Sequence, residues 1–152
     1  MPVVATARWL DIDEEKMLRA VTLSNLIAIR IKAKFGRLSN LCGATVAGTG
    51  AACGITYLLG GGYHEICCAI QNMVGNVTGM VCDGAKASCA AKIASSVDAA
   101  LLGYNMYKCH QEFKGGDGIV MKDIETTIKG IGRLGKDGMK ETNEEIIRLM
   151  IE

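Results

Sequence analysis

Hydrophobic residues along most of this chain recur every three or four positions, the period of an amphipathic helix. The first predicted helix begins at Glu14, where Asp11 or Asp13 can cap it, and ends at Gly36. Within it, residues 27–31 alternate in a way that also fits a strand, and we retain the helix prediction there.

Further helical segments are predicted from the same periodicity and from glycine stops. They cover residues 39–59, 64–74, 85–108, 124–134 and 139–150. The polar, glycine-spaced run 72–84 is predicted to be a loop. In the alanine-rich segment 85–108, the predicted buried face consists of Ile93, Val97, Ala100 and Leu101. The pattern predicts an all-α, compact glycine-rich domain over residues 1–152.

The stretch from Leu38 to Tyr63 has no charged residue, which raises a membrane-spanning helix as an alternative. Its residues are mostly Gly, Ala and Thr, which bury little apolar area, and Gly50 and Gly54 have the spacing that lets helices approach closely. We therefore favour a helix buried inside a soluble domain, and no membrane partner.

The charge and composition of the chain limit which binding partners and which cellular compartment we expect. Lys and Arg total 17 against 16 Asp and Glu, and aromatic residues make up only 5%, which argues against nucleic acid as a partner. Seven cysteines without a secretory signal pattern indicate reduced thiols in the cytoplasm. A hydrophobic content of 49% leads us to expect self-association.

Three cysteines are the best candidates for chemistry: Cys42, Cys82 and Cys89. Thiolates are soft ligands for iron-sulfur clusters, zinc or copper(I), and three of them on a cubane would leave one iron open. Buried cysteine also occurs as a small hydrophobe, so a purely structural role stays open. The remaining four are interpreted as structural: Cys53, Cys67, Cys68 and Cys109.

Other polar residues near these cysteines could orient a substrate. Asn72 and Thr78 offer amide and hydroxyl groups, and Lys86 could hold a carboxylate, although such residues are also common in turns and on surfaces. His64 and His110 have no catalytic neighbours in the sequence and are predicted to lie on the surface.

A long motif resembles a known family. It reads Gln71-Asn-Met-Val-Gly-Asn-Val-Thr-Gly-Met-Val-Cys-Asp-Gly-Ala-Lys-Ala-Ser-Cys89, and it is similar to the serine dehydratase-like alpha chain family that includes L-cysteine desulfidase. Further matching runs occur in the same order, so the resemblance covers nearly the whole chain: Leu38-Ser-Asn-Leu-Cys-Gly43, Gly54-Ile-Thr-Tyr-Leu-Leu-Gly-Gly61, Asp117-Gly-Ile119 and Gly132-Arg-Leu-Gly-Lys-Asp-Gly-Met139.

The resemblance implies a fold, a cofactor and an activity. It implies the helical fold of the iron-sulfur serine dehydratase alpha chain, with a 4Fe-4S cluster held by Cys42, Cys82 and Cys89. The implied reaction is α,β-elimination of L-cysteine or L-serine to pyruvate and ammonia, with release of sulfide or water. Asn72, Thr78 and Lys86, chosen above from residue type alone, are the expected substrate contacts.

Two departures from the family pattern bear on activity. Ala44 stands where family members often have a second cysteine, and the chain resembles only the C-terminal portion of the family sequence. The absent N-terminal region, or a separate subunit, would carry the proton-abstracting group, so the isolated chain is expected to be a poor catalyst. The rival hypothesis is a non-catalytic helical binding or scaffold protein with buried or zinc-bound cysteines.

Overall fold

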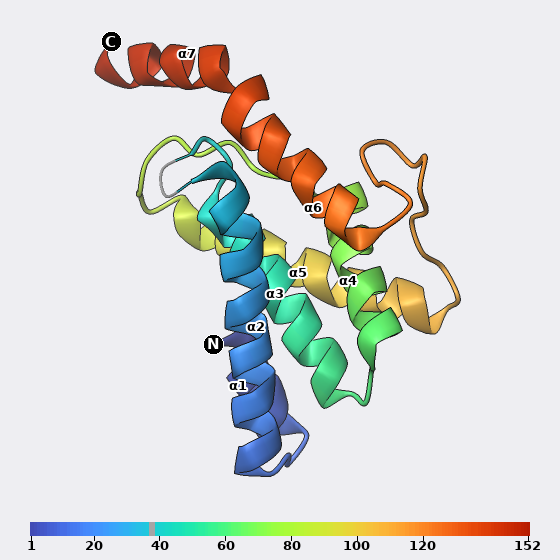
Figure 1. Cartoon of the computed structure of the whole chain (residues 1–152). Helices are drawn as coiled ribbons and strands as arrows, with labels where there is room; N and C mark the ends of the chain where they lie inside the picture. Colours follow the sequence, from blue (N-terminus) through green and yellow to red (C-terminus); the bar gives the residue numbers. More distant parts are fainter. Residues whose placement is uncertain (37–38) are drawn as a thin grey trace.

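The computed structural model describes residues 1–36 and 39–152, and in these residues the chain is all-α, as predicted (Figure 1). Leu38, which begins one of the family-like runs and the uncharged stretch, lies outside the described residues. The elements are α1 (Pro2–Trp9), α2 (Glu14–Phe35), α3 (Gly43–Leu58), α4 (Tyr63–Asn76), α5 (Cys89–Lys108), α6 (Ile124–Arg133), the π-helical turn η1 (Leu134–Gly138) and α7 (Lys140–Ile151).

Helix α3 forms the centre of the molecule. It packs against α1, α2, α4 and α5, and 12 of its 16 residues are buried. Glycines make this close packing possible: a Cβ on Gly48 would lie 2.8 Å from the Ser96 Cβ of α5, and one on Gly50 would collide with the Ser24 carbonyl of α2. The prediction of a buried, small-residue helix is confirmed.

No helix within the described residues combines the length and the apolar character needed to span a membrane.

Helix α2 starts and stops as the sequence predicts. The Asp13 carboxylate accepts a hydrogen bond from the Lys16 amide at 2.9 Å, and Gly36 caps the end with a φ of 90°. The helix runs without a break through residues 27–31, so the strand alternative is wrong.

Three predicted boundaries were wrong. The helix predicted over residues 85–108 begins only at Cys89. Residues 39–42 precede α3 outside any helix, because the backbone of Asn40, Leu41 and Cys42 pairs with another segment of the chain. Helix α4 extends to Asn76, so the beginning of the predicted loop 72–84 is helical.

The buried face of α5 also differs from the prediction. Ile93 and Leu101 are 54% and 42% exposed. Ala100 is buried, as predicted. The other buried residues of α5 are small and allow a closer approach to α3 and α4 than branched side chains do: Ser96, Ala99 and Gly103.

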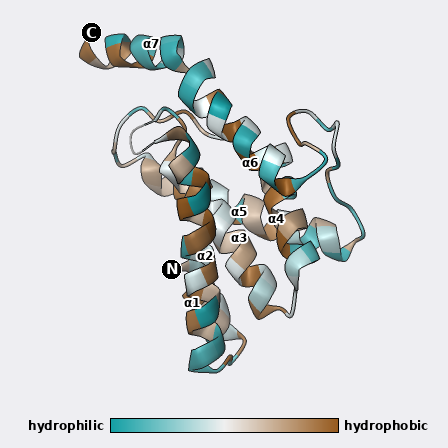
Figure 2. Ribbon diagram, viewed as in Figure 1, coloured by the Kyte–Doolittle hydropathy of each residue, from teal (hydrophilic) through white to brown (hydrophobic). Residues whose placement is uncertain are grey.

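The C-terminal part leads away from this core. Ile128 and Ile131 of α6 are buried, as the helical periodicity of residues 124–134 predicts, and α6 packs against α2. The π-helical turn η1 then redirects the chain into α7, which projects from the other helices in Figure 1 and has no buried residue. Figure 2 shows α7 in alternating teal and brown, whereas α3 is mostly pale.

Helix α1 was not predicted. It is only eight residues long, which is too short for a strong periodic signal, although Pro2 at its first turn is a favoured starting residue. Val3 and Ala7 of α1 are buried and belong to a cluster with Ala51, Ile55 and Leu58 of α3.

Candidate functional site

The chain segments that carry Cys42 and Cys82 lie side by side. The Cys42 amide donates to the Met80 carbonyl at 2.8 Å, and the Cys82 amide donates to the Asn40 carbonyl at 2.7 Å. This antiparallel pairing joins two regions forty residues apart in the sequence and fixes the two cysteine backbones next to each other.

Cys89 is tied to the same loop from the other side. It is the first residue of α5, and its Sγ lies 3.8 Å from the Gly84 carbonyl. One turn later, the Lys92 ammonium donates to the Val81 carbonyl at 3.0 Å and to the Asp83 carboxylate at 2.5 Å. These bonds fold the loop that bears Cys82 onto the start of α5.

Lys92 also lies close enough to Cys42 and Cys89 to interact electrostatically with both thiols. The Asp83 carboxylate raises the pKa of Lys92 above its ordinary value, and the nearby Cys42 and Cys89 thiols add to this effect. In return, the hydrogen bond from Lys92 lowers the pKa of Asp83. Lys92 was not predicted from the sequence, in which an isolated lysine looks like an ordinary surface residue.

Two of the three cysteines stand at helix N-termini. Cys42 is the N-cap of α3, and Cys89 is the first residue of α5. Backbone amides and the positive end of the helix dipole favour a negative charge at such positions. The setting therefore suits thiolates and an anionic group that they bind.

A buried hydroxyl beside Cys42 has no partner. Within the described part of the chain, the Thr45 Oγ1 atom is buried without a hydrogen bond, and Thr45 lines a cavity of about 10 Å³ together with Cys42 and Thr78. An unsatisfied buried donor is costly and calls for an explanation. A sulfur-rich anionic group at Cys42 is a fitting acceptor, so the residues present fit an iron-sulfur cluster.

The predicted substrate residues are not all brought together. Thr78 lies beside Cys42 at this cavity, where its hydroxyl donates to the Val74 carbonyl at 2.8 Å. Lys86 is exposed on the loop between Cys82 and Cys89, close enough to Asp83 to contribute to lowering its pKa.

Asn72 is built into the core instead. It is fully buried; its Nδ2 donates to the Gly103 carbonyl at 2.9 Å, and its Oδ1 accepts from the Phe113 amide at 2.9 Å. Both ends of the amide thus hold α4 to α5 and to the following loop. A substrate contact from Asn72 stays a prediction that this arrangement does not favour.

An open cavity of about 470 Å³ borders Cys82. Lys136 of η1 and Lys140 of α7 line it, together with Asn40 and Asn143. Two ammonium groups and two amides can attract and orient a carboxylate. These residues were not predicted from the sequence, because η1 and α7 are far from the Cys82 loop along the chain and become its neighbours only in the fold.

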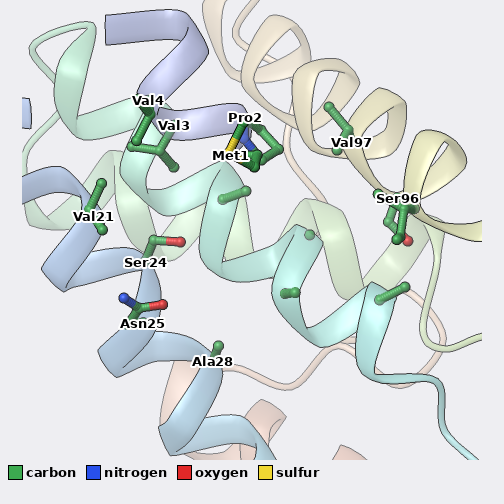
Figure 3. A pocket seen from close by; sticks show the side chains of 15 residues that line it. Met1, Pro2, Val3, Val4, Val21, Ser24, Asn25, Ala28, Ser96 and Val97 are labelled. Atoms are coloured by element: carbon green, nitrogen blue, oxygen red, sulfur yellow. The ribbon is translucent and has the colours of Figure 1, made fainter. Parts of the chain in front are cut away.

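A second cavity, of about 370 Å³, lies among α1, α2, α3 and α5 and is shown in Figure 3. Ser24 and Asn25 of α2 and Ser96 of α5 are polar groups on opposite sides of that view. The remaining lining is apolar, and no charged side chain takes part. This cavity is therefore poorly suited to an amino acid, which carries two charges.

The other cysteines lie apart from the trio. Cys53 is fully buried, and burial raises the pKa of its thiol to about 12. Cys109 is exposed after α5, and Cys67 is half-buried. Cys68 is buried and contacts His64 and Glu112, whereas His64 and His110 are both on the surface, as predicted.

Comparison with known proteins identifies relatives over the whole chain. A UPF0597 protein of Desulfitobacterium hafniense (strain Y51) is 56% identical over 151 residues, which cover 99% of this chain and 35% of that protein. UPF0597 proteins of Lachnoclostridium phytofermentans and Phocaeicola vulgatus are 50% and 46% identical, again over 99% of this chain and 36% and 35% of their own lengths. The chain thus spans about one third of the length of these relatives.

No solved structure matches the chain. The family model described as serine dehydratase alpha chain matches residues 1–148. With nearly every residue inside that match, the chain belongs to the serine dehydratase alpha chain family.

Proposed function

We propose that this chain is the iron-sulfur portion of a lyase that eliminates sulfide from L-cysteine, or water from L-serine. The observation that carries the proposal is the backbone pairing that sets Cys42 beside Cys82, with Lys92 tying the Cys82 loop to the helix that begins at Cys89. Membership of the serine dehydratase alpha chain family agrees with this reaction class.

Cys42, Cys82 and Cys89 are the proposed ligands of a 4Fe-4S cluster, which would supply a Lewis-acid iron to polarise the amino acid. Two of these thiols stand at helix N-termini, where the helix dipole stabilises a thiolate, and the Lys92 ammonium lies near both of them. The unpartnered Thr45 hydroxyl can donate to a sulfur atom there.

The substrate would enter through the open cavity beside Cys82. Lys136 and Lys140 provide positive charges for the carboxylate, and Lys86 provides a third on the adjacent loop. Lys92 is already engaged with Asp83 and Val81, so its role is to position the loop rather than to move a proton.

The proton-abstracting group is proposed to lie in the part of the longer relatives that this chain does not span. Exposed apolar residues offer a surface for that part to cover. Leu18, Leu26 and Ile29 lie along one side of α2 and are each more than half exposed. The same surface would account for self-association of the chain alone.

Anaerobic reconstitution with iron and sulfide tests the proposal. We expect a brown protein with broad visible absorption and about equal amounts of bound iron and sulfide. Adding the remaining region of a longer relative should then produce pyruvate and sulfide from L-cysteine, because it brings the base to the bound substrate.

The alternative is a non-catalytic helical protein whose cysteines are buried or bind zinc. A colourless protein that takes up zinc but no sulfide would favour it, because zinc has a filled d shell. Full activity from the isolated chain would instead show that the proton-abstracting group lies within these 152 residues.

A further inference from the structure

A second group of side chains of the types that bind metals lies away from the cysteine trio. His64 and Cys68 are one turn apart on α4, and Glu112 follows α5. The His64 Nε2 and Glu112 Oε2 atoms lie 3.6 Å and 2.7 Å from the Cys68 Sγ, and all three ligand atoms lie within 4.8 Å of one another.

These distances fit one ion rather than a cluster. Zinc bonds of about 2.3 Å to sulfur and 2.0–2.1 Å to nitrogen, at a tetrahedral angle, set the two ligand atoms roughly 3.5 Å apart. The separation of His64 from Cys68 is 3.6 Å. The Cys68 thiol donates a hydrogen bond to Glu112, and an ion in place of that proton would separate the sulfur from the carboxylate oxygen.

The group of His64, Cys68 and Glu112 has one side buried in the protein and one side open to solvent. Cys68 is 1% exposed, whereas the Glu112 side chain is 28% exposed and His64 is on the surface. His64 and Glu112 also line an open cavity of about 580 Å³ with Lys114 and Lys122. An ion held between the thiol and this cavity would have protein on one side and solvent on the other.

We propose that His64, Cys68 and Glu112 bind a single divalent ion of the zinc class, with its fourth coordination position open to this cavity. One nitrogen, one sulfur and one oxygen ligand form a donor set that zinc accepts, and three protein ligands leave room for water or an anion. The bound ion joins α4 to the segment after α5, so it stabilises the folded chain in proportion to its occupancy.

The chain offers a matched test, because it has two histidines and both are exposed. His64→Asn removes a proposed ligand, and His110→Asn removes the other histidine. Each variant is titrated with Co²⁺, which reports thiolate ligation by its charge-transfer band, and then with Zn²⁺ in competition. The cysteine trio is identical in both variants, so any cobalt it binds cancels in the comparison.

We expect His110→Asn to bind metal as the unmodified chain does. His64→Asn should bind one ion fewer, or bind that ion with lower affinity. The loss of affinity should exceed the roughly 10–100-fold seen when a hydrogen-bond partner of a metal ligand is removed, because His64 is proposed as a ligand itself. Zinc should raise the melting temperature of His110→Asn by more than that of His64→Asn, because only His110→Asn keeps all three proposed ligands. Glu112→Gln, at a partly exposed position, should weaken binding in the same way. Equal stoichiometry, cobalt spectra and zinc affinity in the two histidine variants would overturn the proposal and leave a hydrogen-bonded cluster only.

Discussion

Leu41 and Val81 form an isolated antiparallel bridge, and each is followed directly by a cysteine. The bridge is the point at which the start of α3 and the loop before α5 become neighbours. It requires extended backbone on both sides, which is why α3 cannot begin before Gly43. The geometry of the cysteine site thus depends on two backbone hydrogen bonds between segments far apart in the sequence.

Replacing any one of Cys42, Cys82 and Cys89 with serine should abolish or strongly weaken cluster binding, because a hydroxyl is a poor soft ligand. The measurement is iron and sulfide content after anaerobic reconstitution. Cys109→Ser is the control, since Cys109 is an exposed thiol outside the site. Equal cluster loss in the control would contradict the ligand assignment.

Lys92→Met should shorten the lifetime of the reconstituted cluster by roughly tenfold or more, the range seen when an outer-shell partner of a metal site is removed. Methionine keeps the apolar stem but cannot bond to Val81 and Asp83. Lys129→Met, at an exposed position on α6, is the matched control. The decay of visible absorption in air measures the effect, and the same decay rate in both variants would rule out a positioning role for Lys92.

Gly48→Ala should destabilise the fold by about 1–3 kcal/mol, because the added methyl group overlaps Ser96 in a tightly packed helix interface. Gly43→Ala is the matched substitution at the start of the same helix, where nothing lies within 4 Å of an added Cβ. It should stabilise by about 0.4–1 kcal/mol by restricting the unfolded chain. Urea unfolding of the two variants gives both values, and a stabilising Gly48→Ala would contradict the packing described for α3.

Alkaline pH should weaken the fold through Cys53. Burial raises the pKa of this thiol from 9.0 to about 12, so the folded state keeps a proton that the unfolded state loses above pH 9. The contribution of Cys53 is therefore complete below pH 9 and declines as the pH rises toward 12, by at most about 1.4 kcal/mol per pH unit.

Cys53→Ala should remove this contribution from the slope of the free energy of unfolding against pH. Cys109→Ala, which changes an exposed thiol, should leave that slope unchanged. Chemical unfolding at several pH values between 8 and 11, roughly the window of free-thiol ionisation, gives the slopes. An unchanged slope in Cys53→Ala would mean that the thiol does not titrate with folding.

Local sequence signals predicted the helices well where cap and periodicity agree. Asp13 and Gly36 mark the ends of α2, and the isoleucines of α6 mark its buried side. The prediction was wrong where tertiary contacts override local pattern: α5 buries Ser96 and Gly103 because α3 and α4 come too close for larger side chains. A periodic pattern depends only on which positions are hydrophobic, and it does not indicate how closely two helices approach each other.

The candidate site was accessible to sequence reasoning only in part. The cysteine trio followed from residue type and from family resemblance, whereas Lys92, Lys136 and Lys140 did not. Isolated lysines look like ordinary surface residues in a sequence. Their relation to Cys82 depends on the fold of η1 and on the loop pairing, which are long-range features.

The absence of any buried residue from α7 has a consequence for motion. A helix without a buried residue loses little stabilising contact when it detaches from the other helices. We therefore expect α7 to unfold locally, at a free-energy cost far below that of global unfolding. Its amides should exchange with deuterated solvent much faster than those of α3. Because Lys140 and Asn143 line the cavity beside Cys82, this local opening would also change the width of the entrance to the site.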